Sequence, residues 1–171
     1  LAPAILKAAS WIWPDNSSWD LYNCYALFRT AFDCVATPRR AIAYVTADQS
    51  YRLYVNGRYV CRGPARGFQS HWPFDEVDIA PFLRAGRNVI AIRAYNPGIG
   101  TFQYIHQGAA GMLFGLQAGK LHVVSDTQWK CRRQSGVQKA AVQSSMQLFP
   151  QEILDARIEH PRVTIAAIDN T

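Results

Sequence analysis

The chain has 171 residues, of which 49% are apolar and 18% are charged, and its formal net charge is +6. That length suffices for one domain whose hydrophobic core needs neither a metal nor a disulfide. No apolar run reaches the ~18 residues of a membrane-spanning helix, so we expect no membrane partner. The positive charge would suit nucleic acid, but the basic residues are scattered over predicted turns and strand ends. We therefore expect no nucleic-acid partner.

The first residues, LAPAILKAASWIWP, contain neither an initiator methionine nor the charged-then-apolar order of a signal peptide. We therefore expect a processed or excised piece of a longer protein, and the sequence indicates no compartment.

Period-two alternation begins at residues 22–34. One face carries residues such as Cys24 and Phe28, and the other carries Asn23 and Arg29. This pattern predicts a long, half-buried strand.

The next strand is predicted at residues 41–48, and a turn at 48–50 leads into the segment YRLYVNGRYV. In that segment Asn56 and Gly57 both tolerate a positive φ, which fits a type I′ turn. We therefore predict an antiparallel hairpin over residues 51–60.

The second half of the chain continues this pattern. An aromatic loop at 63–75 precedes a predicted short helical turn at 75–86, and residues 88–95 are apolar on both faces, as in a central strand. Further strands are predicted at 110–117, 120–126 and 127–133. Many short strands with almost no helix predict an all-β fold, an antiparallel β-sandwich of the jelly-roll, galactose-binding-domain-like type.

From Gln134 the alternation loosens and aromatic residues become few. We predict a β-sandwich domain over residues 1–133. Residues 134–171 are expected to form a final strand or two and an extension that leads to a following domain.

The four cysteines show no zinc-ligand spacing. Cys24 and Cys34 lie about 33 Å apart on one predicted strand, too far to bridge each other. We expect buried core thiols, and a disulfide between Cys61 and one of the other cysteines stays open.

Several segments carry a resemblance to a known family. They are LYNCYALFRTAF, ADQSYRLYVNGRYVCRGPARG, DEVDIAPFLRAGRNVIAIRAY and SDTQWKCRR. In this order they resemble the N-terminal galactose-binding-like β-sandwich of bacterial α-L-rhamnosidases, over about residues 11–157. The segment FPQEILDAR is similar to the part of such enzymes that leads into the next domain.

This resemblance implies that rhamnoside hydrolysis occurs in a separate helical-barrel domain. An inverting mechanism needs two carboxyl groups ~6.5–9.5 Å apart across the scissile bond. No catalytic residue can be carried over to this chain, and the implied partner is the catalytic domain of the same parent chain. Bacterial cytoplasm, periplasm and secretion all stay open as its location.

The acidic residues favour structural roles. Asp75, Glu76 and Asp78 form a cluster that could suggest calcium, but we expect turn and capping roles, with Asp78 as an N-cap ahead of Ile79. Glu152 and Asp155 could be mistaken for an acid/base pair, and we expect them to contact the next domain instead. We predict no catalytic site, no metal site and no cofactor.

Carbohydrate is the candidate ligand, because sugar sites combine an aromatic platform with a few directed polar groups. The candidate sugar-binding residues are Arg62, Arg66, His71, Trp72 and Tyr104. Trp72 would stack on a sugar ring while Arg66 bonds hydroxyl groups. The same loops also contain Gln69, Phe74, Asn96, Gln103 and His106.

The alternative interpretation is that Trp72 and Phe74 pack beneath a long loop. The other tryptophans are expected in the core: Trp11, Trp13, Trp19 and Trp129.

Three functions therefore stay open. The chain is a non-catalytic accessory domain of an α-L-rhamnosidase-like hydrolase, a carbohydrate-binding module, or a lectin-like protein without an enzyme. The fold alone does not decide among them.

Overall fold

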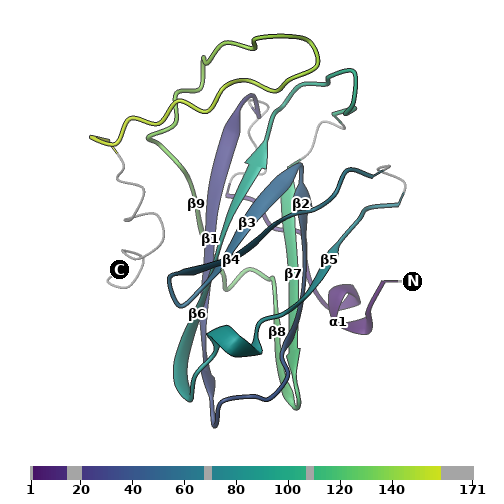
Figure 1. Ribbon diagram of the computed structural model, residues 1–171, viewed down its shortest axis with the longest axis vertical. Coiled ribbons are helices and arrows are strands. Elements are labelled where there is room, and N and C mark those ends of the chain that lie inside the picture. Colours follow the sequence, from purple (N-terminus) through teal and green to yellow (C-terminus); the bar gives the residue numbers. More distant parts are fainter. Residues whose placement is uncertain (1, 15–20, 68–70, 107–109, 159–171) are drawn as a thin grey trace.

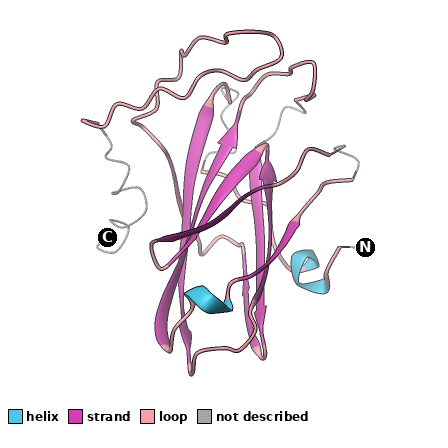
Figure 2. Cartoon of the chain, in the orientation of Figure 1, coloured by secondary structure: helices cyan, strands magenta, loops and turns pink. Residues whose placement is uncertain are grey.

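The computed structural model describes residues 2–14, 21–67, 71–106 and 110–158. Two antiparallel sheets face each other as a β-sandwich (Figures 1 and 2), which confirms the predicted all-β class. The first sheet has the order β4-β3-β6-β1-β9, with β1 (Cys24–Cys34), β3 (Ser50–Val55), β4 (Arg58–Gly63), β6 (Gly86–Asn96) and β9 (Lys130–Arg133). The second has the order β5-β2-β7-β8, with β2 (Ile42–Asp48), β5 (Asp75–Asp78), β7 (Gly111–Ala118) and β8 (Leu121–Val124). The jelly-roll description stays a prediction.

Helix is confined, in the described ranges, to α1 (Ala4–Lys7) and a 3₁₀ helix at Ala80–Phe82. None of the described helices is long and apolar enough to span a membrane. The short helical turn predicted before Gly86 is present as this 3₁₀ helix, whereas the acidic residues expected ahead of it lie on strand β5, because residues 75–78 pair with β2. Asp78 nevertheless satisfies the backbone amide of Ala80, at 3.0 Å.

The core lies between the two sheets. Along β2, Ala43, Val45 and Ala47 alternate into it and have no exposed surface. Phe114 of β7 packs on Trp129 with ring centroids 5.4 Å apart.

The tryptophans divide between the core and the rim. Trp13 and Trp129 are buried, as predicted. The prediction for Trp11 is wrong, because its side chain is 46% exposed and packs against the Trp72 ring at the end of the sandwich. Trp19 lies outside the described residues.

The predicted central strand is confirmed. β6 lies in the middle of the five-stranded sheet, between β1 and β3. The predicted hairpin is also confirmed as β3 and β4, with φ of 50° at Asn56 and 76° at Gly57. The predicted turn at 48–50 does not form a hairpin. β2 and β3 belong to different sheets, and the chain crosses from one sheet to the other at this turn.

Residues 134–158, here called the strap, lie over the outer face of the five-stranded sheet. Gln134 donates its backbone N–H to the carbonyl oxygen of Tyr25, at 2.8 Å. Phe149 packs edge-on against Tyr95, with ring centroids 6.0 Å apart. The described part of the strap contains an isolated bridge between Val137 and Leu154 but no strand.

The strap explains why the prediction of a half-buried first strand was only partly right. The first six residues of β1 are all buried, including Tyr25 on the outer face, where the strap begins. A covering segment from the far end of the chain leaves no mark on the local alternation.

No disulfide joins the four cysteines, all of which the structure describes. Cys24 and Cys34 are buried, as predicted. Cys61 is half-buried, and Cys131 is exposed because it lies on the edge strand β9, which corrects its expected place in the core.

Candidate functional site

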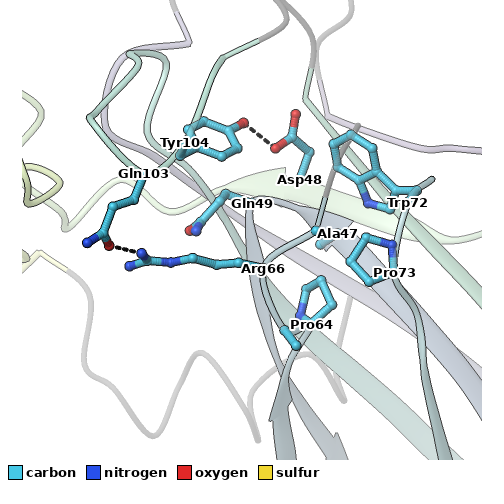
Figure 3. A pocket seen from close by; sticks show the side chains of 11 residues that line it. Ala47, Asp48, Gln49, Pro64, Arg66, Trp72, Pro73, Gln103 and Tyr104 are labelled. Atoms are coloured by element: carbon cyan, nitrogen blue, oxygen red, sulfur yellow. Dashed lines mark hydrogen bonds between the residues drawn. The ribbon is translucent and has the colours of Figure 1, made fainter. Parts of the chain in front are cut away.

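A pocket lies at the end of the sandwich where β2 crosses to β3. Three segments form it: the end of β2, the loop at 64–74 and the loop at 97–106 (Figure 3). Its lining residues are Ala47, Asp48, Gln49, Pro64, Ala65, Arg66, Gly67, Trp72, Pro73, Gln103 and Tyr104.

Three of the five predicted sugar-binding residues meet in this pocket, namely Arg66, Trp72 and Tyr104. The other two do not line it. Arg62 is exposed on β4, opposite Arg52 of β3, and His71 is exposed in the loop just before Trp72. Alternation along β4 turns the Arg62 side chain away from the loops that build the pocket.

The other residues named from these loops also lie in different places, some at the pocket and some away from it. Gln103 lines the pocket, and His106 contacts the ring of Tyr104 at a centroid distance of 6.4 Å. Phe74 packs against Tyr44 instead, which agrees with a packing role. Asn96 is buried and donates to the backbone oxygen of Asp48, at 3.3 Å. Gln69 lies outside the described residues.

Asp48 is the pocket residue that sequence analysis missed. Its side chain is buried at the end of β2, and the Tyr104 hydroxyl donates to its Oδ1 (Figure 3). Burial raises the pKa of Asp48, although the Tyr104 hydrogen bond and the nearby His106 act in the opposite direction. An aspartate at the end of a strand looks like an ordinary turn residue, so nothing local indicated this role.

Arg66 and Gln103 connect the two loops across the pocket mouth, where the guanidinium donates to the Gln103 Oε1 (Figure 3). This contact ties the loop after β4 to the loop after β6. The two loops therefore hold a polar rim above the buried carboxylate.

Trp72 supplies the aromatic surface of the pocket. Its ring packs edge-on against Trp11, with centroids 5.6 Å apart. Its indole N–H is buried, and no acceptor for it exists among the described residues. A buried donor without a partner is costly, so a water molecule or a ligand oxygen at this position would stabilise the site.

The pocket is small. Its volume is about 360 Å³, and this figure includes space open to solvent. A hydroxyl group fits inside, whereas a whole sugar ring would have to lie across the mouth. The pocket thus offers a carboxylate acceptor, an aromatic surface and a guanidinium–amide rim to a neutral polar ligand.

Two of the three carboxylates in the cluster at 75–78 are engaged in the fold. Asp75 accepts a 2.5 Å hydrogen bond from the Tyr51 hydroxyl. Asp78 accepts hydrogen bonds from the backbone amides of Ala80 and Ala41. Among the described residues, no three His, Cys, Asp or Glu side chains lie close enough to hold a metal ion. Asp75 and Glu76 sit on a strand, which corrects their expected turn roles.

Glu152 and Asp155 also have partners within the chain. Glu152 accepts from Arg93 of β6 at 2.7 Å and thereby fastens the strap to the sheet. Asp155 pairs with Arg157 at 2.6 Å. Both residues thus have partners within this domain, and their expected contact with a following domain stays a prediction.

Comparisons with known proteins agree with this architecture, although no family model matches the chain. The α-L-rhamnosidase of Streptomyces avermitilis is 26% identical over 131 residues, which cover 73% of this chain and 12% of that protein. The crystal structure of a GH78 family rhamnosidase of Bacillus sp. GL1 matches 87% of this chain with 32% identity and a TM-score of 0.81. This chain is a homologue of a β-sandwich domain of α-L-rhamnosidases. It spans only 16% of the Bacillus rhamnosidase chain.

A lectin shares the sandwich of this rhamnosidase-type domain. The apo form of Pleurotus ostreatus lectin matches 75% of the chain with 26% identity and a TM-score of 0.57, and the chain spans 36% of that lectin. The rhamnosidase-type domain therefore has structural neighbours both in glycosidases and in a lectin.

Proposed function

We propose that the chain is a non-catalytic accessory β-sandwich domain of an α-L-rhamnosidase-like glycoside hydrolase, and that it supports the catalytic domain of that enzyme. The observation that carries this proposal is the match of 87% of the chain to only 16% of the Bacillus rhamnosidase. A segment that fills one sandwich of a much longer hydrolase fits an accessory role.

The carboxylates support the absence of catalysis in this domain. Glycoside hydrolysis needs two carboxyl groups that are free to exchange protons and to face the glycosidic bond. Asp48 is the only carboxylate among the described residues that line the pocket, so the pocket does not present such a pair.

The pocket supports a second part of the proposal, namely that the domain contacts carbohydrate there. A sugar ring would stack on Trp72 across the mouth, and one hydroxyl would donate to Asp48 while Arg66 donates to another. The alternative function is an autonomous carbohydrate-binding module or lectin-like domain, which the lectin neighbour favours.

The hydrolase part is tested with an aryl α-L-rhamnoside. We expect no release of the aryl group by the chain alone, because Asp48 is the only carboxylate among the described residues that line the pocket and hydrolysis needs two. The longer polypeptide that carries the chain is expected to hydrolyse the same substrate. Turnover by the chain alone that disappears in Asp48→Asn would contradict the non-catalytic role.

The carbohydrate part is tested by titrating the chain with L-rhamnose, galactose and rhamnosylated oligosaccharides, followed by tryptophan fluorescence and ligand-observed NMR. We expect saturable, millimolar binding that is lost in Trp72→Ala and weakened about tenfold in Arg66→Ala, since one charge-assisted hydrogen bond is worth about 1.5 kcal/mol.

Arg62→Ala is the matched control, because it removes the same residue type outside the pocket. Equal losses in both arginine variants, or no saturable binding to any of the sugars, would contradict carbohydrate contact at the pocket.

A further inference from the structure

The exposed apolar side chains of this domain gather at one end of the sandwich. Ten large hydrophobic side chains of the described residues are notably exposed, and seven of them lie within residues 102–105 and 142–158. The five that form the surface considered below, called the apolar end, are Phe102, Ile105, Val142, Met146 and Leu148. Single exposed hydrophobic residues are ordinary, but a group of this kind marks an interaction surface.

The two segments that carry the apolar end, namely the loop after β6 and the strap, touch each other. Phe102 donates its backbone N–H to the Met146 carbonyl oxygen at 3.3 Å. Two residues further along, the ring of Tyr104 meets that of Phe149, with centroids 5.6 Å apart. Figure 1 shows both segments at the same end of the sandwich.

The charge pattern of these segments is unusual for a solvent-facing surface. The loop at 97–106 and the strap residues 140–151 contain no Asp, Glu, Lys or Arg, in a chain that is 18% charged. Arg93, on β6 before the loop, and Glu152, directly after the strap residues, pair with each other at 2.7 Å. Depletion of charge together with exposed Phe and Met is typical of the buried centre of a protein interface.

We infer that the apolar end docks against another domain of the same polypeptide. This inference rests on the proposed function. The occupant follows from two observations: the Bacillus rhamnosidase matched by this sandwich has most of its chain outside the matched part, and the strap that carries most of the apolar end already packs through its other side on the sheet. The docked domain would pack on the side of the strap that faces away from the sheet.

The docking also has a consequence for the pocket. Tyr104 donates to Asp48 inside the pocket and contacts Phe149 of the strap. The neighbouring domain would therefore cover a surface adjoining the pocket mouth, and a ligand at the mouth would lie beside the domain boundary.

The test compares hydrogen exchange of residues 97–106 and 140–151 in the isolated chain and in the longer polypeptide. We expect exchange of these backbone amides to be about tenfold slower in the longer polypeptide. The double variant Phe102→Lys with Met146→Lys should remove that protection, because two charges would be buried at the contact. The control is Val35→Lys, which places a lysine at a fully exposed hydrophobic position outside the apolar end.

Two results would overturn the inference. One is equal exchange of both loops in the isolated chain and the longer polypeptide. The other is a concentration-dependent dimer of the isolated chain that the double lysine variant dissociates, because the occupant would then be a second copy. Rhamnoside hydrolysis by the longer polypeptide is measured separately. Protected loops without hydrolysis would contradict the proposed function alone, and hydrolysis without protection would contradict the docking alone.

Discussion

Asp48 and Asp78 are both aspartates at strand ends, yet the fold shifts the pKa values of their carboxyl groups in opposite directions. Burial raises the pKa of Asp48. The backbone amides of Ala80 and Ala41 lower the pKa of the exposed Asp78. Asp78 therefore contributes stability above its ordinary pKa, and that stability is lost as the pH falls through its lowered value. Ionised Asp48 instead lowers the stability of the fold at neutral pH.

Asp48→Asn is expected to raise the melting temperature of the unliganded chain at pH 7 by a few degrees. The amide oxygen still accepts from Tyr104 but carries no buried charge. The advantage should shrink as the pH falls through the raised pKa toward the ordinary value of 3.8, where Asp48 itself becomes protonated in the folded chain. Thermal unfolding of both proteins between pH 4 and about 8 measures this. An asparagine variant that is less stable at pH 7 would refute it.

At the scale of elements, one residue of the β3–β4 hairpin both forms the turn and makes tertiary hydrogen bonds. Asn56 has the positive φ that the type I′ turn requires. Its side chain also donates to the Phe82 carbonyl oxygen at 2.9 Å and accepts from the backbone N–H of Val89 at 2.9 Å. The turn thus fixes the hairpin against β6 and the 3₁₀ helix, a role that a turn motif alone does not indicate.

Asn56→Gly separates these two contributions, because glycine adopts the same φ without strain but makes no side-chain hydrogen bonds. We expect a loss of about 1–3 kcal/mol in the free energy of unfolding, since the Val89 amide and the Phe82 carbonyl lose their partner. Urea unfolding measures this loss. As a control, Gly57→Ala should be destabilising through its φ of 76° alone, because no heavy atom lies within 4 Å of the added Cβ. An Asn56→Gly chain as stable as the unmodified one would mean that only the turn conformation matters.

At the scale of the whole molecule, the strap covers part of the outer face of the five-stranded sheet and shields it from water. Arg93 is held by Glu152 and Gln134, each at 2.7 Å, and lies over the Tyr25 ring at 4.1 Å. Burial, together with the Glu152 carboxylate, raises the pKa of Tyr25 to about 12. The sheet is therefore covered on both faces at this end, although its first strand has the alternation of a half-exposed one.

Glu152→Ala is expected to lower the free energy of unfolding by about 1 kcal/mol, a modest value because the glutamate is partly exposed. It should also lower the pKa of Tyr25 below about 12, since the carboxylate raises it. Urea unfolding and absorbance titration at high pH measure the two effects. Glu152→Gln keeps a hydrogen-bond acceptor for Arg93 and should retain more of the stability. No change in either quantity would mean that the strap is held without this ion pair.

The sequence by itself determined what depends on neighbours in the chain. The hairpin follows from Asn56 and Gly57, and the central place of β6 follows from its apolar residues on both faces, because φ preferences and period-two burial are local properties. Only the tertiary structure placed Asp48 beside Tyr104 and the strap over Tyr25. It also made residues 75–78 a strand by pairing them with β2. These contacts join segments tens of residues apart, and burial by a distant segment leaves no periodic signal in the residues that it covers.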